Sequence, residues 1–224
     1  MAAKLGGSTP TRQVLHPARS TWAAWTLLIV VIAVGLSLDL GSKQWAFERV
    51  ANQPVQVDRA AALANPGYSP IPPHDGVVAL PGSLLDFRLV LNSGAVFGIG
   101  AHQRWFFISF SVIAVGVAVF LFGWRTEAKD RMLHIGIAMI LAGALGNLWD
   151  RLIIGRVRDF LHMLPGWELP FGLHWPGGNP EVWPWIFNIA DVLLLAGMGL
   201  VMLDMWWRGR AEAKDRQENL LNSP

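Results

Sequence analysis

The sequence predicts an all-α integral membrane protein with four transmembrane helices and a small extracytoplasmic β-strand region, and three observations predict it. Apolar residues make up 53% of the 224 residues and charged residues only 15%, which is too little charge to cover a soluble domain of this length. Four apolar runs are each long enough to cross a bilayer, which takes roughly 20 residues. Lys and Arg are concentrated in the segments that would share one side of the membrane.

The four apolar runs are expected to be the membrane spans. Their boundaries are about 22–42, 105–124, 132–150 and 185–207. The first run is longer than the apolar region of a signal peptide and no small-residue cleavage site follows it, which favours a membrane span. Most of the twelve Trp residues lie at the ends of these runs, where their amphipathic rings favour the headgroup region.

The distribution of positive charge predicts the orientation of the chain. The tail of residues 1–20, the short loop at 125–131 and the tail of residues 208–224 together hold ten of the eighteen Lys and Arg. Because positively charged loops stay on the cytoplasmic side, both termini are predicted to be cytoplasmic, and the first tail is predicted to be disordered. Residues 21–207 then form a single four-span domain.

The two long connections, about 45–103 and 160–184, are expected to face outward. In residues 85–91, Leu-Asp-Phe-Arg-Leu-Val-Leu, large apolar side chains recur with a period of two, which predicts a half-buried strand. Glycines within 94–100 then interrupt regular structure. The second connection is rich in Trp, Pro and Gly and is expected to lie along the membrane surface.

Composition and motifs also argue against several classes of function. The net charge of +2, without a basic stripe, is too small to indicate a nucleic-acid-binding protein. The chain has no cysteine, so a disulfide, a thiolate metal site and a cysteine nucleophile are all impossible. The chain contains neither a Gly-x-Ser-x-Gly motif nor a His-Glu-x-x-His motif. The sequence therefore gives no indication of a serine peptidase or a zinc peptidase. The loop histidines His162 and His174 are expected to be solvated rather than to bind a metal.

Ionisable residues inside apolar spans cost about 2.5–3.5 kcal/mol each on insertion, so each of them needs an explanation. Asp39 and Lys43 are four residues apart and share one helical face. Their simplest interpretation is an interfacial ion pair in which Lys43 extends to the headgroups. Asp204 lies near the cytoplasmic end of its span and is expected to be solvated.

A second polar cluster, Asn147, Asp150 and Arg151, shares one helical face at spacings of three and four residues. One interpretation is a polar network at a helix end that only fixes packing, because Arg is permanently charged and makes a good structural contact. Small residues within 142–146 precede the cluster, and they would let neighbouring helices approach closely.

The third cluster contains Asn188 and Asp191, at the start of a strongly apolar helix. A carboxylate there can be a simple cap that the helix dipole favours. It can also do chemistry, because two carboxylates within a few ångströms share one proton and so provide an acid and a base at the same pH. Asp159 and Asp191 are the candidates, since both are expected at outer helix ends at similar depth.

At these residues the chain resembles the lipoprotein signal peptidases, or signal peptidase II, the aspartyl enzymes of bacterial membranes that process prolipoproteins. The matching pieces occur in the family's order within about residues 25–205, and they are specific only in combination. They are Asp39-x-x-Ser-Lys43, Asn92-Ser-Gly-Ala-Val-Phe97, Gly146-Asn-x-x-Asp-Arg151 with Gly155-Arg-Val-Arg-Asp-Phe160, and Phe187-Asn-Ile-Ala-Asp191.

The resemblance implies an intramembrane aspartyl endopeptidase of the bacterial inner membrane, with Asp159 and Asp191 as the catalytic pair near the outer face. It implies no metal or other cofactor. The partners it implies are membrane lipid and a prolipoprotein whose cysteine carries diacylglyceryl, with cleavage just before that cysteine. It further implies that eight residues shape the site and hold the substrate: Asp39, Lys43, Asn92, Gly94, Asn147, Asp150, Arg151 and Asn188.

Two other functions stay open from the residues alone. Asp159 and Asp191 could be proton or cation sites of a small transporter or channel, although four spans without an inverted repeat argue against a transporter. The polar residues could also only fix helix packing in a structural subunit. The segments at 50–82 and 160–184 are longer than is usual in the family, which leaves the shape of the substrate entrance open.

Overall fold

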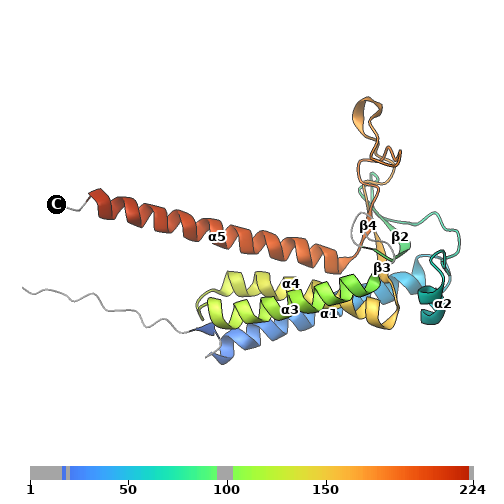
Figure 1. Ribbon diagram of the computed structural model, residues 1–224. Helices are drawn as coiled ribbons and strands as arrows, with labels where there is room; N and C mark the ends of the chain where they lie inside the picture. Colours follow the sequence, from blue (N-terminus) through green and yellow to red (C-terminus); the bar gives the residue numbers. More distant parts are fainter. Residues whose placement is uncertain (1–16, 19–20, 95–102, 222–224) are drawn as a thin grey trace, which may run out of the picture.

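The computed structural model describes residues 17–18, 21–94 and 103–221. Figure 1 shows a bundle of long helices with a small sheet and its loops at one end. The helices are α1 (Trp22–Arg49), α2 (Arg59–Ala64), α3 (Arg104–Arg125), α4 (Arg131–Ile153) and α5 (Ile189–Leu221), with a short 3-10 helix at Pro170–Gly172. The strands are β1 (Val77–Leu80), β2 (Leu85–Asn92), β3 (Val157–Met163) and β4 (Ile186–Phe187).

Four of the helices in the described part of the chain, α1, α3, α4 and α5, are long and apolar enough to cross a membrane. Together with the sheet, they make the chain a mostly helical membrane protein, as predicted. The predicted disordered tail at 1–20 lies outside the described residues except for Pro17 and Ala18. Ala18 is buried, and its N–H donates to the carbonyl of Thr126 in the α3–α4 loop.

The bundle is built around α4, which packs against α1, α3 and α5. Small residues allow these close approaches, because a Cβ at Gly143 would collide with the backbone of Ala190 and a Cβ at Gly136 would meet the carbonyl of Gly197. The prediction that small residues near 142–146 let helices approach closely is therefore confirmed. The same approach brings the end of α4 beside the start of α5.

The sheet is antiparallel, in the order β1-β2-β3-β4, and covers the end of the bundle where α1 and α4 finish. The predicted strand at 85–91 is confirmed as β2: Leu89 is buried, and Leu85, Phe87 and Leu91 pack against the same core cluster as Phe160 of β3. This cluster joins the sheet to the last turns of α1. Strands β1, β3 and β4 were not predicted.

The ends of two helices differ from the predicted spans. Helix α1 continues beyond 42 to Arg49, and α5 begins at Ile189 rather than at 185, because Ile186 and Phe187 pair with β3 as strand β4. Helix α5 also continues beyond 207 to Leu221 through an exposed segment that includes an i,i+4 ion pair between Lys214 and Glu218.

Two predictions about solvated side chains are wrong. Asp204 is buried rather than solvated, because the guanidinium of Arg208 donates to both of its oxygens and also contacts Asp130 at 2.9 Å. His162 is buried within β3, with its ring 3.4 Å from Glu181. Of the two loop histidines His162 and His174, His174 is exposed, as expected.

Candidate active site

At the start of α5, side-chain carboxylates and amides accept the free backbone N–H groups of the helix. Asn188 precedes the helix, and its side-chain oxygen accepts the N–H of Asp191 at 3.1 Å while its own N–H donates to the Asp191 carboxylate at 3.2 Å. This reciprocal pair is a capping box. The N–H of Ala190, also free of a partner within the helix, donates to Asp39 Oδ1 of α1 at 2.8 Å. Asp191 is thus a helix cap, as the simple interpretation held, and its carboxylate is fixed in place.

Asp159 lies on β3, opposite Val90 of β2, and not at a helix end as the sequence suggested. The chain turns at Gly155, which has a positive φ of 90°, and then enters the strand. Asp159 is only 2% exposed. Its two oxygens accept hydrogen bonds from the amides of Asn92, at 2.9 Å, and Asn188, at 2.6 Å.

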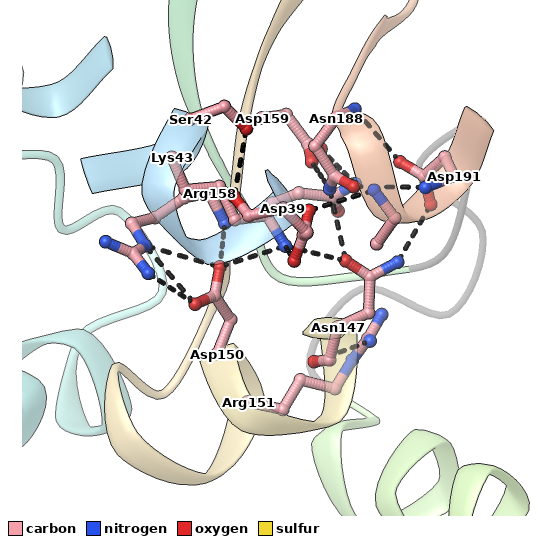
Figure 2. A network of polar contacts seen from close by, with 12 residues as sticks. Asp39, Ser42, Lys43, Asn147, Asp150, Arg151, Arg158, Asp159, Asn188 and Asp191 are labelled. Carbon is pink, nitrogen blue, oxygen red and sulfur yellow. Dashed lines mark hydrogen bonds and ion pairs between the residues drawn. The ribbon is translucent and has the colours of Figure 1, made fainter. Parts of the chain in front are cut away.

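Asn188 connects the two candidate catalytic carboxylates. Its side-chain amide donates to Asp159, and its backbone N–H donates to Asp191. Asn147 of α4 completes the arrangement, because its amide donates to Asp191 Oδ1 at 2.8 Å and its oxygen accepts from Asn188 at 3.1 Å (Figure 2). A strand, a helix start and the end of α4 therefore bring Asp159 and Asp191 to one place.

Burial, followed by the neighbouring negative charge of Asp191, raises the pKa of Asp159 to about 7. The amides of Asn92 and Asn188 and the positive charge of Lys43 oppose this rise. A carboxyl group with this pKa changes its protonation state near neutral pH, which is a property of acid–base groups in hydrolytic sites. Asp159 can therefore hold a proton where an ordinary carboxyl group would not.

Lys43 lies at the centre of the polar network and is 0% exposed. Its ammonium donates to Asp39 Oδ2 at 2.8 Å and Asn147 Oδ1 at 3.1 Å, and it lies 3.4 Å from Asp150 Oδ2. The pairing of Asp39 with Lys43 is confirmed, but the interpretation that Lys43 extends to the headgroups is wrong. The reason is that α4 packs over this face of α1.

Asp150 receives a second cation that the sequence analysis missed. Arg158 of β3 donates from its backbone N–H at 3.0 Å and from its guanidinium at 2.8 Å to the Asp150 carboxylate. The sequence did place Arg158 directly before the candidate Asp159, and this adjacency could have drawn attention to it. On an exposed strand, however, alternation would turn its side chain to solvent rather than toward α4. Two cations, Lys43 and Arg158, therefore neutralise a fully buried Asp150.

Arg151 points away from its neighbour Asp150. Its guanidinium donates to the carbonyl of Gly94 at 2.9 Å and to that of Asn147 at 3.2 Å, and it lies over the ring of Phe107 on α3. It therefore ties the end of β2 to α4 and α3. Residues 95–102, which include Phe97 of the Asn-Ser-Gly-Ala-Val-Phe motif and two of the predicted interrupting glycines, lie outside the described residues.

Arg156 was also missed, and it holds α2 and the loop that follows it. Its guanidinium donates to backbone carbonyls in and after α2, and it is buried. The four acceptors are the carbonyls of Ala62, Asn65, Pro66 and Tyr68. Arg156 thereby fixes the first outer connection against the strand that carries Asp159.

The structure brings all ten residues of the sequence-based site into one contiguous network. Figure 2 labels eight of them, all but Asn92 and Gly94. The ten residues come from α1, β2, α4, β3 and α5, except that Gly94 follows β2 and Asn188 directly precedes α5. The same contacts fix helix packing, so the network has a structural role whatever else it does. Which of these side chains act in catalysis stays a prediction.

Comparisons with known proteins agree on one family. A family model described as "Signal peptidase (SPase) II" matches residues 30–207. The "Lipoprotein signal peptidase" of Photorhabdus laumondii subsp. laumondii is 32% identical over 193 residues, which cover 84% of this chain and 90% of that protein. The protein of the same name from Yersinia pestis (strain Pestoides F) is 31% identical over 195 residues, covering 84% of this chain and 89% of that one.

Solved structures show the same fold. One described as "Bacterial membrane enzyme structure by the in meso method at 2.3 A resolution" aligns with a TM-score of 0.55 and 22% identity, over 86% of this chain and 93% of that one. Another, described in the same words at 1.9 Å, has a TM-score of 0.51 and 21% identity, over 86% and 97% of the two chains. At this identity the likeness concerns the fold alone.

Proposed function

The chain belongs to the signal peptidase II family, proteases that process lipoproteins, and we propose that it is an intramembrane aspartyl endopeptidase. It removes the signal peptide from diacylglyceryl-modified prolipoproteins by cleaving just before the lipid-bearing cysteine. Family membership favours this function over a transporter or a structural subunit. The observation that carries the aspartyl mechanism is the joining of two carboxylates, the buried Asp159 and the half-buried Asp191, by Asn188.

The two carboxylates have different surroundings, and from these we infer different roles. Asp191 lies at the start of α5, where the helix dipole and the N–H groups of Asn147 and Asn188 stabilise its negative charge. Asp159 is buried on the strand with its pKa raised to about 7, so it retains a proton to near neutral pH. In the proposed enzyme Asp191 is the base and Asp159 is the acid.

Hydrolysis then proceeds without a covalent enzyme intermediate. Asp191 takes a proton from a water molecule while the hydroxyl oxygen attacks the scissile carbonyl, and Asp159 donates a hydrogen bond to the carbonyl oxygen. The tetrahedral intermediate collapses by breaking the C–N bond. The departing amine takes a proton from the carboxyl pair, which restores the starting state of one shared proton.

The substrate must present an accessible peptide bond at the end of the bundle. A carbonyl inside a helix is already hydrogen-bonded, so the signal helix has to unwind near Asp159 and Asp191. The diacylglyceryl chains can stay in lipid between helices and so hold the peptide bond in position. In the proposed enzyme strand β2, whose last residue Asn92 donates to Asp159, binds the extended segment of the substrate.

The proposed enzyme spans the bacterial inner membrane four times with both termini in the cytoplasm, and residues 21–207 are its catalytic domain. Supporting this, the α3–α4 loop and the end of α5 are rich in Lys and Arg, and they lie at the opposite end of the bundle from the sheet. The carboxyl pair then lies near the outer face.

Cleavage of a defined substrate tests the proposal. We expect the purified protein in phospholipid vesicles to cleave a prolipoprotein that carries diacylglyceryl on its cysteine, and to leave the same preprotein without the lipid uncut. Sequencing the product should find the modified cysteine at its N-terminus. Cleavage should also persist in EDTA, since no metal is expected. Release of a product with a different first residue, or equal cutting of the unlipidated preprotein, contradicts the proposal.

The dependence of cleavage on pH should have two limbs. Because the pKa of Asp159 is about 7, its proton is present below pH 7 and is lost above it, so kcat/KM should fall as the pH rises through 7. At low pH Asp191 takes up a proton and the base is lost, which produces the acid limb. Rates measured with the lipidated substrate in vesicles check this expectation. A rate that stays flat well above pH 7 contradicts the assignment of Asp159 as the acid.

A further inference from the structure

Residues 164–185, between β3 and β4, form an ordered arm that the proposed chemistry does not use. Hydrogen bonds hold its two sides together, from Leu169 N–H to the carbonyl of Pro180 at 2.8 Å and from Val182 N–H to that of Trp167 at 2.7 Å. Trp175, midway along the arm, packs edge to face against Trp185 next to β4, with ring centroids 4.7 Å apart. Figure 1 shows the arm leaving the sheet roughly at right angles to the helices, on the side of α5.

Large apolar side chains on this arm are exposed. Phe171 is 98% exposed and Trp167 is 50% exposed, and Leu173 is exposed as well. Phe171 also has a φ of 61°, a conformation that favours glycine and is an outlier for a bulky residue. With 98% of its surface exposed, the Phe171 side chain is left almost uncovered by the described part of the chain.

The charge of the arm indicates what covers it. Residues 164–185 contain no Lys or Arg, and their charged groups are Glu168, Glu181 and, when protonated, His174. The arm therefore has no attraction for anionic headgroups and no strongly charged patch for a protein partner. Its content of Trp, Phe, Pro and Gly is typical of a segment in the polar–apolar boundary of a bilayer, where Trp rings are enriched.

Exposed Trp residues on the helices mark where that boundary lies. In α1, Trp22 and Trp45 are both exposed, and at 1.5 Å per residue they are roughly 35 Å apart. In α3, Trp105 and Trp124 are exposed and roughly 30 Å apart. These separations match the roughly 30 Å hydrocarbon core of a bilayer and its edges.

The arm starts at the outer of these two Trp levels. Trp45, Trp105 and, on α4, Trp149 lie at the end of the bundle that carries the sheet, and the arm extends from that end along the direction of the membrane plane. Helix α5, which follows the arm and β4 along the chain, also exposes apolar side chains, among them Leu195. The arm thus continues the lipid-facing surface of the helices beyond the bundle.

We propose that residues 164–185 are a membrane-interface arm, which inserts Trp167, Phe171 and Leu173 into the outer-leaflet headgroup region beside α5. The inference rests on the membrane embedding of the proposed function, but not on its chemistry. The arm binds lipid through apolar contact, so its insertion does not depend on anionic lipid. By holding the β3–β4 end of the sheet at the bilayer surface, it keeps the strand that bears Asp159 at the depth of the substrate's lipid anchor.

The absence of native cysteine allows a direct test with single labels. A Phe171→Cys variant carrying the fluorophore NBD is placed in phosphatidylcholine vesicles. The emission should shift to the blue, and lipids with a nitroxide near the headgroup should quench it at least about twofold more strongly than they quench a label at Gln53→Cys. Gln53 is exposed in the first outer connection, and Glu212→Cys on the far end of α5 is a second control. Adding phosphatidylglycerol should change the quenching little.

A second variant tests whether the apolar side chains of the arm cause the insertion of the label. When Trp167 and Leu173 are both changed to Asp in the labelled protein, the label should move into water and become accessible to iodide. A label at residue 171 that iodide reaches as readily as the label at Gln53, with no lipid quenching, overturns the inference. Cleavage of the lipidated preprotein by the same sample separates the two proposals, since an active enzyme with a solvated label refutes the arm alone.

Discussion

Replacing Asp191 with Asn should lower the cleavage rate by about 10³-fold, and Asp159→Asn should have an effect of the same size. Asn has the shape of Asp but cannot do its chemistry. At residue 191 it lacks the negative charge that the base needs, and at residue 159 it lacks the acidic proton that the acid supplies. The folded structure should survive, because an amide at residue 191 retains an oxygen to accept the N–H of Asn188. Each variant loses one side-chain hydrogen bond, which costs about 1–3 kcal/mol of stability.

The control for this pair is Asp75→Asn, which changes an exposed carboxylate in the outer connection before β1. It should cleave at the rate of the unmodified protein. Single-turnover cleavage of the lipidated substrate and thermal unfolding in detergent should be measured on all three variants. If either catalytic variant cleaves within tenfold of the unmodified protein, or is inactive only because it no longer folds, the paired-aspartate mechanism is wrong.

Lys43→Met should be both unstable and poorly active. Lys43 is fully buried between Asp39 and Asp150, and removing one partner of a buried ion pair costs about 3–5 kcal/mol because a charge is left without compensation. Asp150 keeps Arg158, so the larger part of the cost falls on Asp39. Lys43 also holds Asn147, whose amide donates to Asp191, so the base should lose its orientation.

A matched control separates these effects from a general loss of charge. Lys129→Met breaks an exposed ion pair with Glu127 and should cost less than about 1 kcal/mol. Adding Asp39→Asn to Lys43→Met should recover part of the lost stability, since no uncompensated carboxylate remains at residue 39. The double variant should still have a low kcat, because Asn147 still lacks the hydrogen bond from Lys43. Thermal unfolding and kcat should be measured on the unmodified protein, the two single variants and the double variant. If Lys43→Met has the same stability and kcat as Lys129→Met, the expectation is wrong.

Membrane character and the helical spans could be predicted because they depend on local sequence. An apolar run of sufficient length makes a span whatever it packs against, so 105–124 and 132–150 nearly coincide with α3 and α4. The alternation at 85–91 predicted β2 for the same reason, because a strand with one buried face carries that pattern in its own residues. The resemblance of short motifs to those of a known family then identified the residues of the candidate site one by one.

Strands β3 and β4 were not predictable in this way. Strand β3 is buried along nearly its whole length and so has no alternation, and the two residues of β4 read as the start of an apolar span. Both form only because β3 pairs with β2, from which it is separated by two long helices. Asp159 consequently moves from an expected helix end to a strand.

What the sequence determined by itself is the membrane fold class, the family and the identity of the polar residues at membrane depth, since each follows from residue type and spacing. Tertiary structure decided which charges meet. Lys43 is buried instead of extending to headgroups because α4 covers it, and Asp150 is neutralised by Arg158 because β3 returns to α4. The partner and protonation state of a buried ionisable group depend on what packs around it, and only docked helices and paired strands determine that.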